Sequence, residues 1–192
     1  MPKGFDSKAR LGVKGLDDIL VGGLSRGRVF LLEGNPGAGK TTIALQFLIE
    51  GAKLGEKCLY VTLSETESEL RDGAASHGMV LDESISIFEL VPPESLLDSR
   101  QQQSLLYSSD LELGETTKMI FEAVERVKPS RIVLDSLSEI RLLAQSSLRY
   151  RRQILALKHY FARQSATVLL LDDMTTESND KTVHSVVHGV IH

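Results

Sequence analysis

The stretch from Glu33 to Thr42 reads EGNPGAGKTT and directly follows the apolar run RVFLL at residues 28–32. Residues 34–41 fit G-x-x-x-x-G-K-[ST], the pattern of a phosphate-binding P-loop. Glycines in this loop can adopt backbone angles closed to other residues and let successive N–H groups turn toward an anion. The residues predicted to bind the phosphates are Gly34, Asn35, Pro36, Gly37, Ala38, Gly39, Lys40, Thr41 and Thr42.

Two residues at the end of the loop have distinct predicted tasks. Lys40 would reach the β- and γ-phosphates of a nucleotide as a point charge, and the Thr41 hydroxyl would be a Mg²⁺ ligand at the start of a helix. A chance glycine-rich turn, or a loop that has lost its ligand, is the alternative. Residues 28–32 read as a buried strand and residues 41–55 as a helix closed by Gly55, so strand, loop and helix follow in the order that a P-loop requires.

The whole chain has 192 residues, enough for one α/β domain with a sizeable core, and we expect a single domain over residues 1–192. A net charge of −4 gives no general attraction to nucleic acid or to an anionic membrane. The start of the chain is polar, and no apolar run is long enough to span a bilayer. We therefore expect a cytoplasmic protein without a membrane partner.

Short apolar runs alternate with helical patterns along the chain. This alternation predicts an α/β fold with a mostly parallel central sheet and helices on both faces. Residues 115–129 and 149–164 read as the clearest helices, and Pro129 would end the first of them. The predicted strands are residues 28–34, 58–64, 85–90, 131–137 and 167–173.

Other segments are less regular. Residues 12–30 predict a short helix and a tight hairpin ahead of the first core strand, and residues 91–114 predict an excursion from the core. Residues 184–192, HSVVHGVIH, read as a strand, which argues against a metal site at His184 and His188. Because this strand has no polar tail after it, we expect the chain to be a fragment of a longer protein.

Acidic residues follow two of the predicted strands. Asp135 ends the run RIVLD and would point toward the P-loop, where ligands sit in open α/β sheets, and hold the magnesium shell. An acidic cap on a strand end is the simpler alternative. Asp172 and Asp173 end TVLLLDD; either could sense the γ-phosphate, and a turn-forming pair of aspartates is the alternative.

Glu65 is the candidate for activating the attacking water. It stands just past the strand CLYVTL, and the distance from Lys40 suffices for one helix and a return strand, which brings it to the same edge of the sheet. Lys40 and Glu65 are therefore the predicted catalytic residues. Glu67 and Glu69 are interpreted as ordinary acids at the start of a helix.

Three stretches together resemble the KaiC-like branch of the RecA-type ATPases: residues 15–65, RIVLDSLSEIR and VVHGVI. The resemblance covers nearly the whole chain. It implies a RecA-like core, ATP and Mg²⁺ as ligands, and ATP bound between the subunits of a ring, commonly a homo-hexamer. It also implies slow ATP hydrolysis with possible autokinase activity, and it assigns Lys40 and Thr41 to phosphate and Mg²⁺, Asp135 to the metal shell and Glu65 to water.

One departure concerns the residue before Glu65. KaiC proteins often have two adjacent glutamates where this chain has Ser64 and Glu65, which puts a mechanism with two acids in doubt. No regulatory protein partner can be named from the sequence.

Three functions compete at this stage. The first is a ring-forming ATPase whose nucleotide state acts as a switch or timer for partner proteins. The second is a DNA-dependent motor or recombinase, for which Arg149, Arg151, Arg152 and Lys158 form the local basic cluster; on a helix they span more than one face, which favours a solvated surface or a subunit contact over nucleic acid. The third is a nucleotide-binding scaffold without hydrolysis.

Overall fold

Six parallel strands form the central sheet of the computed structural model, which describes residues 8–90, 105–174 and 182–192, with the backbone alone over 105–112. Their order across the sheet is β5-β4-β6-β7-β3-β8. The predicted α/β fold with a parallel sheet is confirmed. In chain order the strands are β3 (Val29–Gly34), β4 (Cys58–Thr62), β5 (Ile85–Glu89), β6 (Arg131–Asp135), β7 (Thr167–Asp173) and β8 (Val190–Ile191).

The five strands predicted from apolar runs are all present, and the runs that form the interior strands β4, β6 and β7 are buried on both faces of the sheet. Every residue of β4 is buried, and so are the first four of β6 and the first six of β7. Continuous burial is the signature of parallel strands covered by helices on both sides. Cys58, the first residue of β4, is fully buried, and burial raises the pKa of its thiol to about 12.

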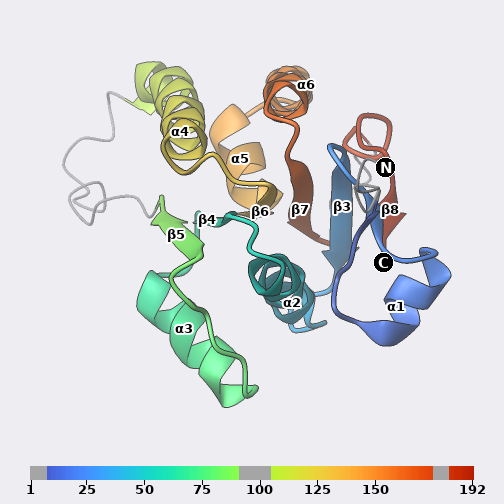
Figure 1. Cartoon of the computed structure of the whole chain (residues 1–192). Coiled ribbons are helices and arrows are strands. Elements are labelled where there is room, and N and C mark those ends of the chain that lie inside the picture. Colours follow the sequence, from blue (N-terminus) through green and yellow to red (C-terminus); the bar gives the residue numbers. More distant parts are fainter. Residues whose placement is uncertain (1–7, 91–104, 175–181) are drawn as a thin grey trace.

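Helices cover both faces of the sheet (Figure 1). On one face lie α2 (Lys40–Lys53) and α3 (Glu67–Ser76), with α1 (Lys14–Ile19) beside them. On the other lie α4 (Leu105–Val127), α5 (Leu137–Ala144) and α6 (Ser147–Arg163). The core is accordingly divided by the sheet into two hydrophobic clusters. No helix in the described ranges has the length and apolar character needed to cross a lipid bilayer.

The amino-terminal segment differs from the predicted tight hairpin. Its short helix is confirmed as α1, but the paired strands β1 (Lys8–Ala9) and β2 (Leu24–Ser25) are antiparallel and lie on either side of that helix in the chain. The carboxylate of Asp17 explains the difference: it accepts hydrogen bonds from the backbone N–H groups of Leu11 (2.8 Å) and Gly12 (3.0 Å). The two paired strands are thus connected through α1, and a tight turn does not join them.

The helix predicted over residues 115–129 begins ten residues earlier, at Leu105, and ends at Val127, before Pro129. The prediction of an excursion is therefore wrong for residues 105–114, and its first part, 91–104, lies outside the described residues. Residues 105–113 contain leucine, serine and acids without a proline, and extending a formed helix costs far less than nucleating one. A single glycine, Gly114, is tolerated within it.

The strand predicted over residues 184–192 is confirmed only at Val190–Ile191. Residues 182–186 form a turn, and the backbone joins the sheet edge through two hydrogen bonds: the His188 N–H donates to the Val29 carbonyl (2.8 Å), and the Leu31 N–H donates to the Gly189 carbonyl (3.0 Å). The side chain of His188 turns back to the same strand, where its Nδ1 lies 3.2 Å from the backbone nitrogen of Val29. The apolar residues of this segment are explained by packing beside β3, because most of them are not part of a strand.

A buried arginine, Arg131, fixes the start of β6 under α2. Its guanidinium donates to the carboxylate of Glu56 (2.6 Å) and to the carbonyl of Phe47 (2.8 Å), and lies 4.8 Å from the centre of the Phe47 ring. Gly51 of α2 leaves the room for it, because a Cβ there would lie 2.6 Å from the arginine Cδ and 2.9 Å from the sulfur of Cys58.

Replacing Gly51 should therefore destabilise the fold. We expect Gly51→Ala to lower the free energy of unfolding by about 1–3 kcal/mol through overpacking against Arg131. Gly73→Ala in α3 is the matched control, because a Cβ there meets nothing within 4 Å; it should raise stability by about 0.5–1 kcal/mol. Urea denaturation of both variants gives the comparison, and a stabilising Gly51→Ala would contradict the role given to close packing.

Candidate functional site

The P-loop joins the carboxyl end of β3 to the amino terminus of α2, as predicted. Gly37 and Gly39 have φ angles of +78° and +89°, in the left-handed region that favours glycine, and Gly39 is the N-cap of α2. Gly34 is instead the last residue of β3. Its lack of a side chain lets the loop pass close to the strand, because a Cβ there would lie 3.3 Å from that of Ala38. The N–H of Ala38 donates to the Asn35 carbonyl (3.1 Å), which tightens the loop.

Lys40 begins α2 and folds back over the loop. Its Nζ donates to the carbonyl oxygens of Gly34 (2.9 Å) and Asn35 (3.0 Å), and it forms an ion pair with Oδ1 of Asp173 at 2.8 Å. The ammonium group therefore lies within the concave side of the P-loop, where the positive end of the α2 dipole also acts.

Asp135 lies directly across from the start of α2. It ends β6, the strand between β4 and β7, and is paired in register with Thr62 of β4. Its Oδ2 accepts hydrogen bonds from the hydroxyl groups of Tyr60 (2.5 Å) and Thr41 (3.4 Å). The fold thus brings the predicted metal ligands Thr41 and Asp135 together.

The environment of Asp135 favours its protonated form. Burial raises the pKa of the carboxyl group, and the hydrogen bonds from Tyr60 and Thr41 oppose the rise only in part. The pKa of the Tyr60 hydroxyl is also well above its ordinary value, because that group is buried and faces the Asp135 carboxylate. An ionised Asp135 is consequently costly in this site unless a cation approaches it.

Glu65 is held by a turn just beyond β4. The hydroxyl of Thr62 accepts a hydrogen bond from the Glu65 N–H (2.9 Å) and donates one to the Glu65 carbonyl (2.8 Å). Partial removal from water, followed by repulsion from Asp135 and Glu69, raises the pKa of the Glu65 carboxyl. Because Thr62 is in register with Asp135, the turn places Glu65 at the same sheet edge as Asp135, as predicted.

The two aspartates at the end of β7 have different surroundings because neighbouring residues of a strand point to opposite faces. Asp173 meets Lys40, whereas Asp172 is buried against α5, where it accepts from Ser138 (3.1 Å) and pairs with Arg141. Of the two aspartates only Asp173 contacts the P-loop, so it is the member of the predicted pair that lies in position to sense a γ-phosphate. Both residues lie within the strand, so the turn-forming alternative is wrong.

Several residues of the site are missing from the sequence prediction. Tyr60 could have been found from strand alternation, since it lies two residues before Thr62, which is in register with Asp135. Glu33 could not: its buried carboxylate lies 2.8 Å from Nε2 of His184 and 2.9 Å from Nδ1 of His192, and nothing in the spacing predicts that contact. Across the described ranges no group of three or more His, Cys, Asp or Glu residues could hold a metal ion.

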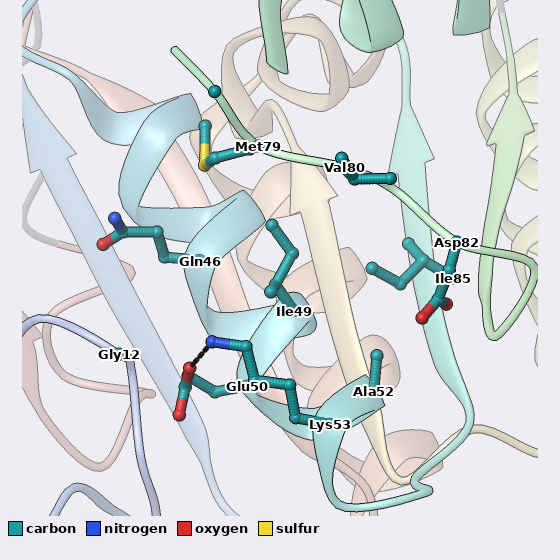
Figure 2. Close-up of a pocket in the computed structure, with 11 residues that line it drawn as sticks. Gly12, Gln46, Ile49, Glu50, Ala52, Lys53, Met79, Val80, Asp82 and Ile85 are labelled. Atoms are coloured by element: carbon teal, nitrogen blue, oxygen red, sulfur yellow. Dashed lines mark hydrogen bonds and ion pairs between the residues drawn. The ribbon is translucent and has the colours of Figure 1, made fainter. Parts of the chain in front are cut away.

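A cavity of about 400 Å³ lies away from the P-loop, between the later turns of α2 and the segment that leads into β5 (Figure 2). Ile49, Met79 and Val80 give it apolar walls, and Glu50 and Lys53 pair at its rim (2.5 Å). The phosphate-binding geometry is at the opposite, amino-terminal end of α2. This cavity is therefore not the continuation of the candidate site.

Comparison with known proteins agrees with this geometry. The family described as "ATPase: KaiC" matches residues 9–192, which is nearly the entire chain. The chain belongs to the KaiC ATPase family. The RecA-type resemblance and fold predicted from the sequence are thereby confirmed.

Relatives within this KaiC family differ in length. A UPF0273 protein of Pyrococcus horikoshii is 27% identical over 187 residues, which cover 95% of this chain and 75% of that protein. The circadian clock oscillator protein KaiC of Parathermosynechococcus lividus is 31% identical over 176 residues, and the clock protein KaiC3 of a Synechocystis strain is 30% identical over 172. The chain spans 31% and 33% of the length of these two clock proteins.

The environment of Asp135 has a measurable cost in stability. Its raised pKa means that the fold prefers the neutral carboxyl, so stability is lost as pH rises through the folded pKa. Asp135→Asn stays neutral and can still accept from Tyr60. Without added metal it should raise the free energy of unfolding at pH 7 by about 0.5–2 kcal/mol, and this gain should shrink as the pH falls through the folded pKa of Asp135.

Urea denaturation between pH 4 and pH 8 in EDTA makes this comparison. Asp72→Asn, which changes an exposed carboxylate of α3, is the control and should shift stability by less than about 0.5 kcal/mol at every pH. A pH-independent destabilisation by Asp135→Asn would show that the carboxylate is favourable in this site.

Proposed function

We propose that this chain is a Mg²⁺-dependent ATPase domain that binds ATP at the P-loop and hydrolyses it with Glu65 as the water-activating residue. The observation that carries the proposal is the meeting of Lys40, Thr41 and Asp135 at the start of α2, with Glu65 at the same edge of the sheet. Membership of the KaiC ATPase family supports nucleotide chemistry at this place.

The donor set suits a nucleotide with its metal ion. Backbone N–H groups around Gly37 and Gly39 and the amino terminus of α2 favour phosphate, and Lys40 supplies the charge for the β- and γ-phosphates. The Thr41 hydroxyl and the Asp135 carboxylate, 3.4 Å apart, offer hard oxygen ligands to Mg²⁺ or its water shell. When bound, Mg²⁺ would neutralise charge on the phosphates. It would also add a second cation, beside Lys40, that stabilises the ionised form of the buried Asp135.

Glu65 has the position and the electrostatics of a general base. Its backbone is fixed at both N–H and carbonyl by Thr62, so the carboxylate is presented from a defined turn. A raised pKa makes its carboxylate a stronger base than an ordinary glutamate. Ser64 stands where the family often has a second glutamate, and we assign the water-activating role to Glu65 alone.

We extend the proposal to self-association, with ATP between the subunits of a ring, commonly of six, whose nucleotide state acts as a switch or timer for a partner protein. Support comes from the clock proteins among the relatives and from large aliphatic side chains on the surface. Those of Ile19 and Val21, two residues apart at the end of α1, are 79% and 80% exposed. Neighbouring exposed aliphatic side chains are typical of interaction surfaces. Autokinase activity is included because of the family likeness alone; among the hydroxyl groups next to Glu65, that of Thr66 already accepts a hydrogen bond as the cap of α3.

The second candidate, a DNA-dependent motor, is less well supported. Arg151 donates to the hydroxyl of Ser185 (3.1 Å), and Lys158 donates to the carbonyl of Val186 (2.5 Å). Half of the basic cluster on α6 therefore holds the carboxyl-terminal segment of the same chain. Binding of a nucleic-acid backbone needs lysine and arginine side chains that are available to phosphates on one face of the helix.

ATP turnover by the parent protein and by Glu65→Gln tests the proposal. We expect Glu65→Gln to reduce turnover about a hundredfold or more, because the amide cannot accept the proton of the attacking water. Glu67→Gln is the matched control; it changes an acid in the first turn of α3 that pairs with Arg71, and it should leave turnover within about twofold. Phosphate release is measured with and without Mg²⁺.

Mass measurement on the same samples separates hydrolysis from assembly. Glu65→Gln should bind ATP and change oligomeric state as the parent does, since Lys40 and Thr41 are intact. If the parent assembles with Mg·ATP but releases no phosphate, the non-hydrolysing scaffold is the correct function. Stimulation of turnover by single-stranded DNA would favour the motor instead.

A further inference from the structure

Three oxygen atoms of the protein surround the ammonium group of Lys40: two carbonyls to which it donates hydrogen bonds and one carboxylate with which it forms an ion pair. An ammonium has three N–H donors. The Nζ atom lies 2.9 Å from the Gly34 carbonyl, 3.0 Å from the Asn35 carbonyl and 2.8 Å from the Asp173 carboxylate. A phosphate that is to be bound by Lys40 must therefore replace one of these three acceptors.

The carboxylate of Asp173 is the acceptor that can be replaced. The two carbonyls belong to the P-loop backbone, which the left-handed glycines hold in place. Asp173 contacts Lys40 through its side chain, which is 34% exposed against 11% for that of Lys40. Rotation of one side chain would release the lysine without any change in the loop.

The backbone of Asp173 cannot move away from the loop. Asp173 is paired in register with Gly34, and the N–H of the next residue, Met174, donates to the Gly34 carbonyl (3.1 Å). After such a rotation the negative charge of Asp173 would therefore still lie close to the place where the lysine would meet phosphate. It also acts on the rest of the site: after burial, Asp173 is the cause of the raised pKa of Glu139, and it adds to the rise at Asp135.

We propose that Asp173 competes with nucleotide phosphate for Lys40 and thereby lowers the affinity of the P-loop for ligands that carry a β-phosphate. This inference rests on the proposed nucleotide site. The competition has two parts: the ion pair must break, and the freed carboxylate then repels the phosphate that replaced it. Asp172 cannot take this place because Ser138 and Arg141 hold it on the opposite face of the sheet.

The nucleotides for the test are chosen by which phosphates Lys40 can contact. Lys40 is expected to contact the β- and γ-phosphates, so ATP and ADP must displace Asp173 and AMP need not. Dissociation constants for the three nucleotides are measured by calorimetry in EDTA, where no metal can screen the carboxylate, for the parent, Asp173→Asn and the surface control Asp72→Asn.

We expect Asp173→Asn to bind ATP and ADP about tenfold more tightly than the parent in EDTA, the size of one like-charge contact in a partly exposed site. AMP binding should change by less than about twofold, and Asp72→Asn should match the parent for all three ligands. With Mg²⁺ present, the gain for ATP should become smaller, because a cation offsets the charge that the substitution removes.

Unchanged or weaker ATP binding by a folded Asp173→Asn would overturn the inference, as would equal gains for AMP and ATP. Asp173→Ser, which removes the same charge with a smaller side chain, repeats the test if the asparagine variant does not fold. If the parent binds none of the nucleotides even with Mg²⁺ present, the proposed function itself fails. Parent binding without the expected gain contradicts the role of Asp173 alone.

Discussion

The hydrogen bonds that Asp135 accepts from Tyr60 and Thr41 connect the elements on which the site depends: β6, β4 and α2. They are possible because β4 and β6 are neighbours in a parallel sheet, whose carboxyl ends meet at one edge. Burial makes the ionised Asp135 costly, so its position is a feature that stability alone does not favour. Under the proposed function, a bound Mg²⁺ would offset this cost, and the Thr41 hydroxyl, 3.4 Å from the Asp135 carboxylate, would be its other ligand.

The same edge of the sheet collects several further acids. Glu65 and Glu139 both have raised pKa values, first through loss of water contact and then through other carboxylates of the site. Lys40 offsets this charge by pairing with Asp173. The protonation of each of these acids therefore depends on the charge of the others. A bound metal ion would lower the pKa of every carboxylate near it, whereas a nucleotide without its metal would add negative charge to a site that already has an excess.

Most of the central strands can be predicted from the sequence, because parallel strands that are buried on both faces appear in it as short apolar runs. The P-loop, Glu65 and Asp135 follow because a glycine pattern or the end of such a run marks each of them. Other features depend on contacts that spacing cannot predict. The short β8 and the turn before it look like one strand because Val186 and Val190 both pack against the core, one from the turn and one from the strand. Arg131 is polar by type yet fully buried, and only the absence of a side chain at Gly51 makes room for it.

The pair of aspartates at the end of β7 shows how one strand supplies two kinds of carboxylate. Alternation directs Asp172 to the face of α5, where burial raises its pKa against the opposing hydrogen bonds of Arg141 and Ser138. Its neighbour Asp173 faces the P-loop and is more exposed, and its partner Lys40 is the residue proposed to bind nucleotide phosphate. The first carboxylate is fixed by partners within the fold, whereas the second, under the proposed function, would lose its partner when phosphate binds. A shift of β7 by one residue would exchange the two environments, so the register between Gly34 and Asp173 decides which acid lies beside Lys40.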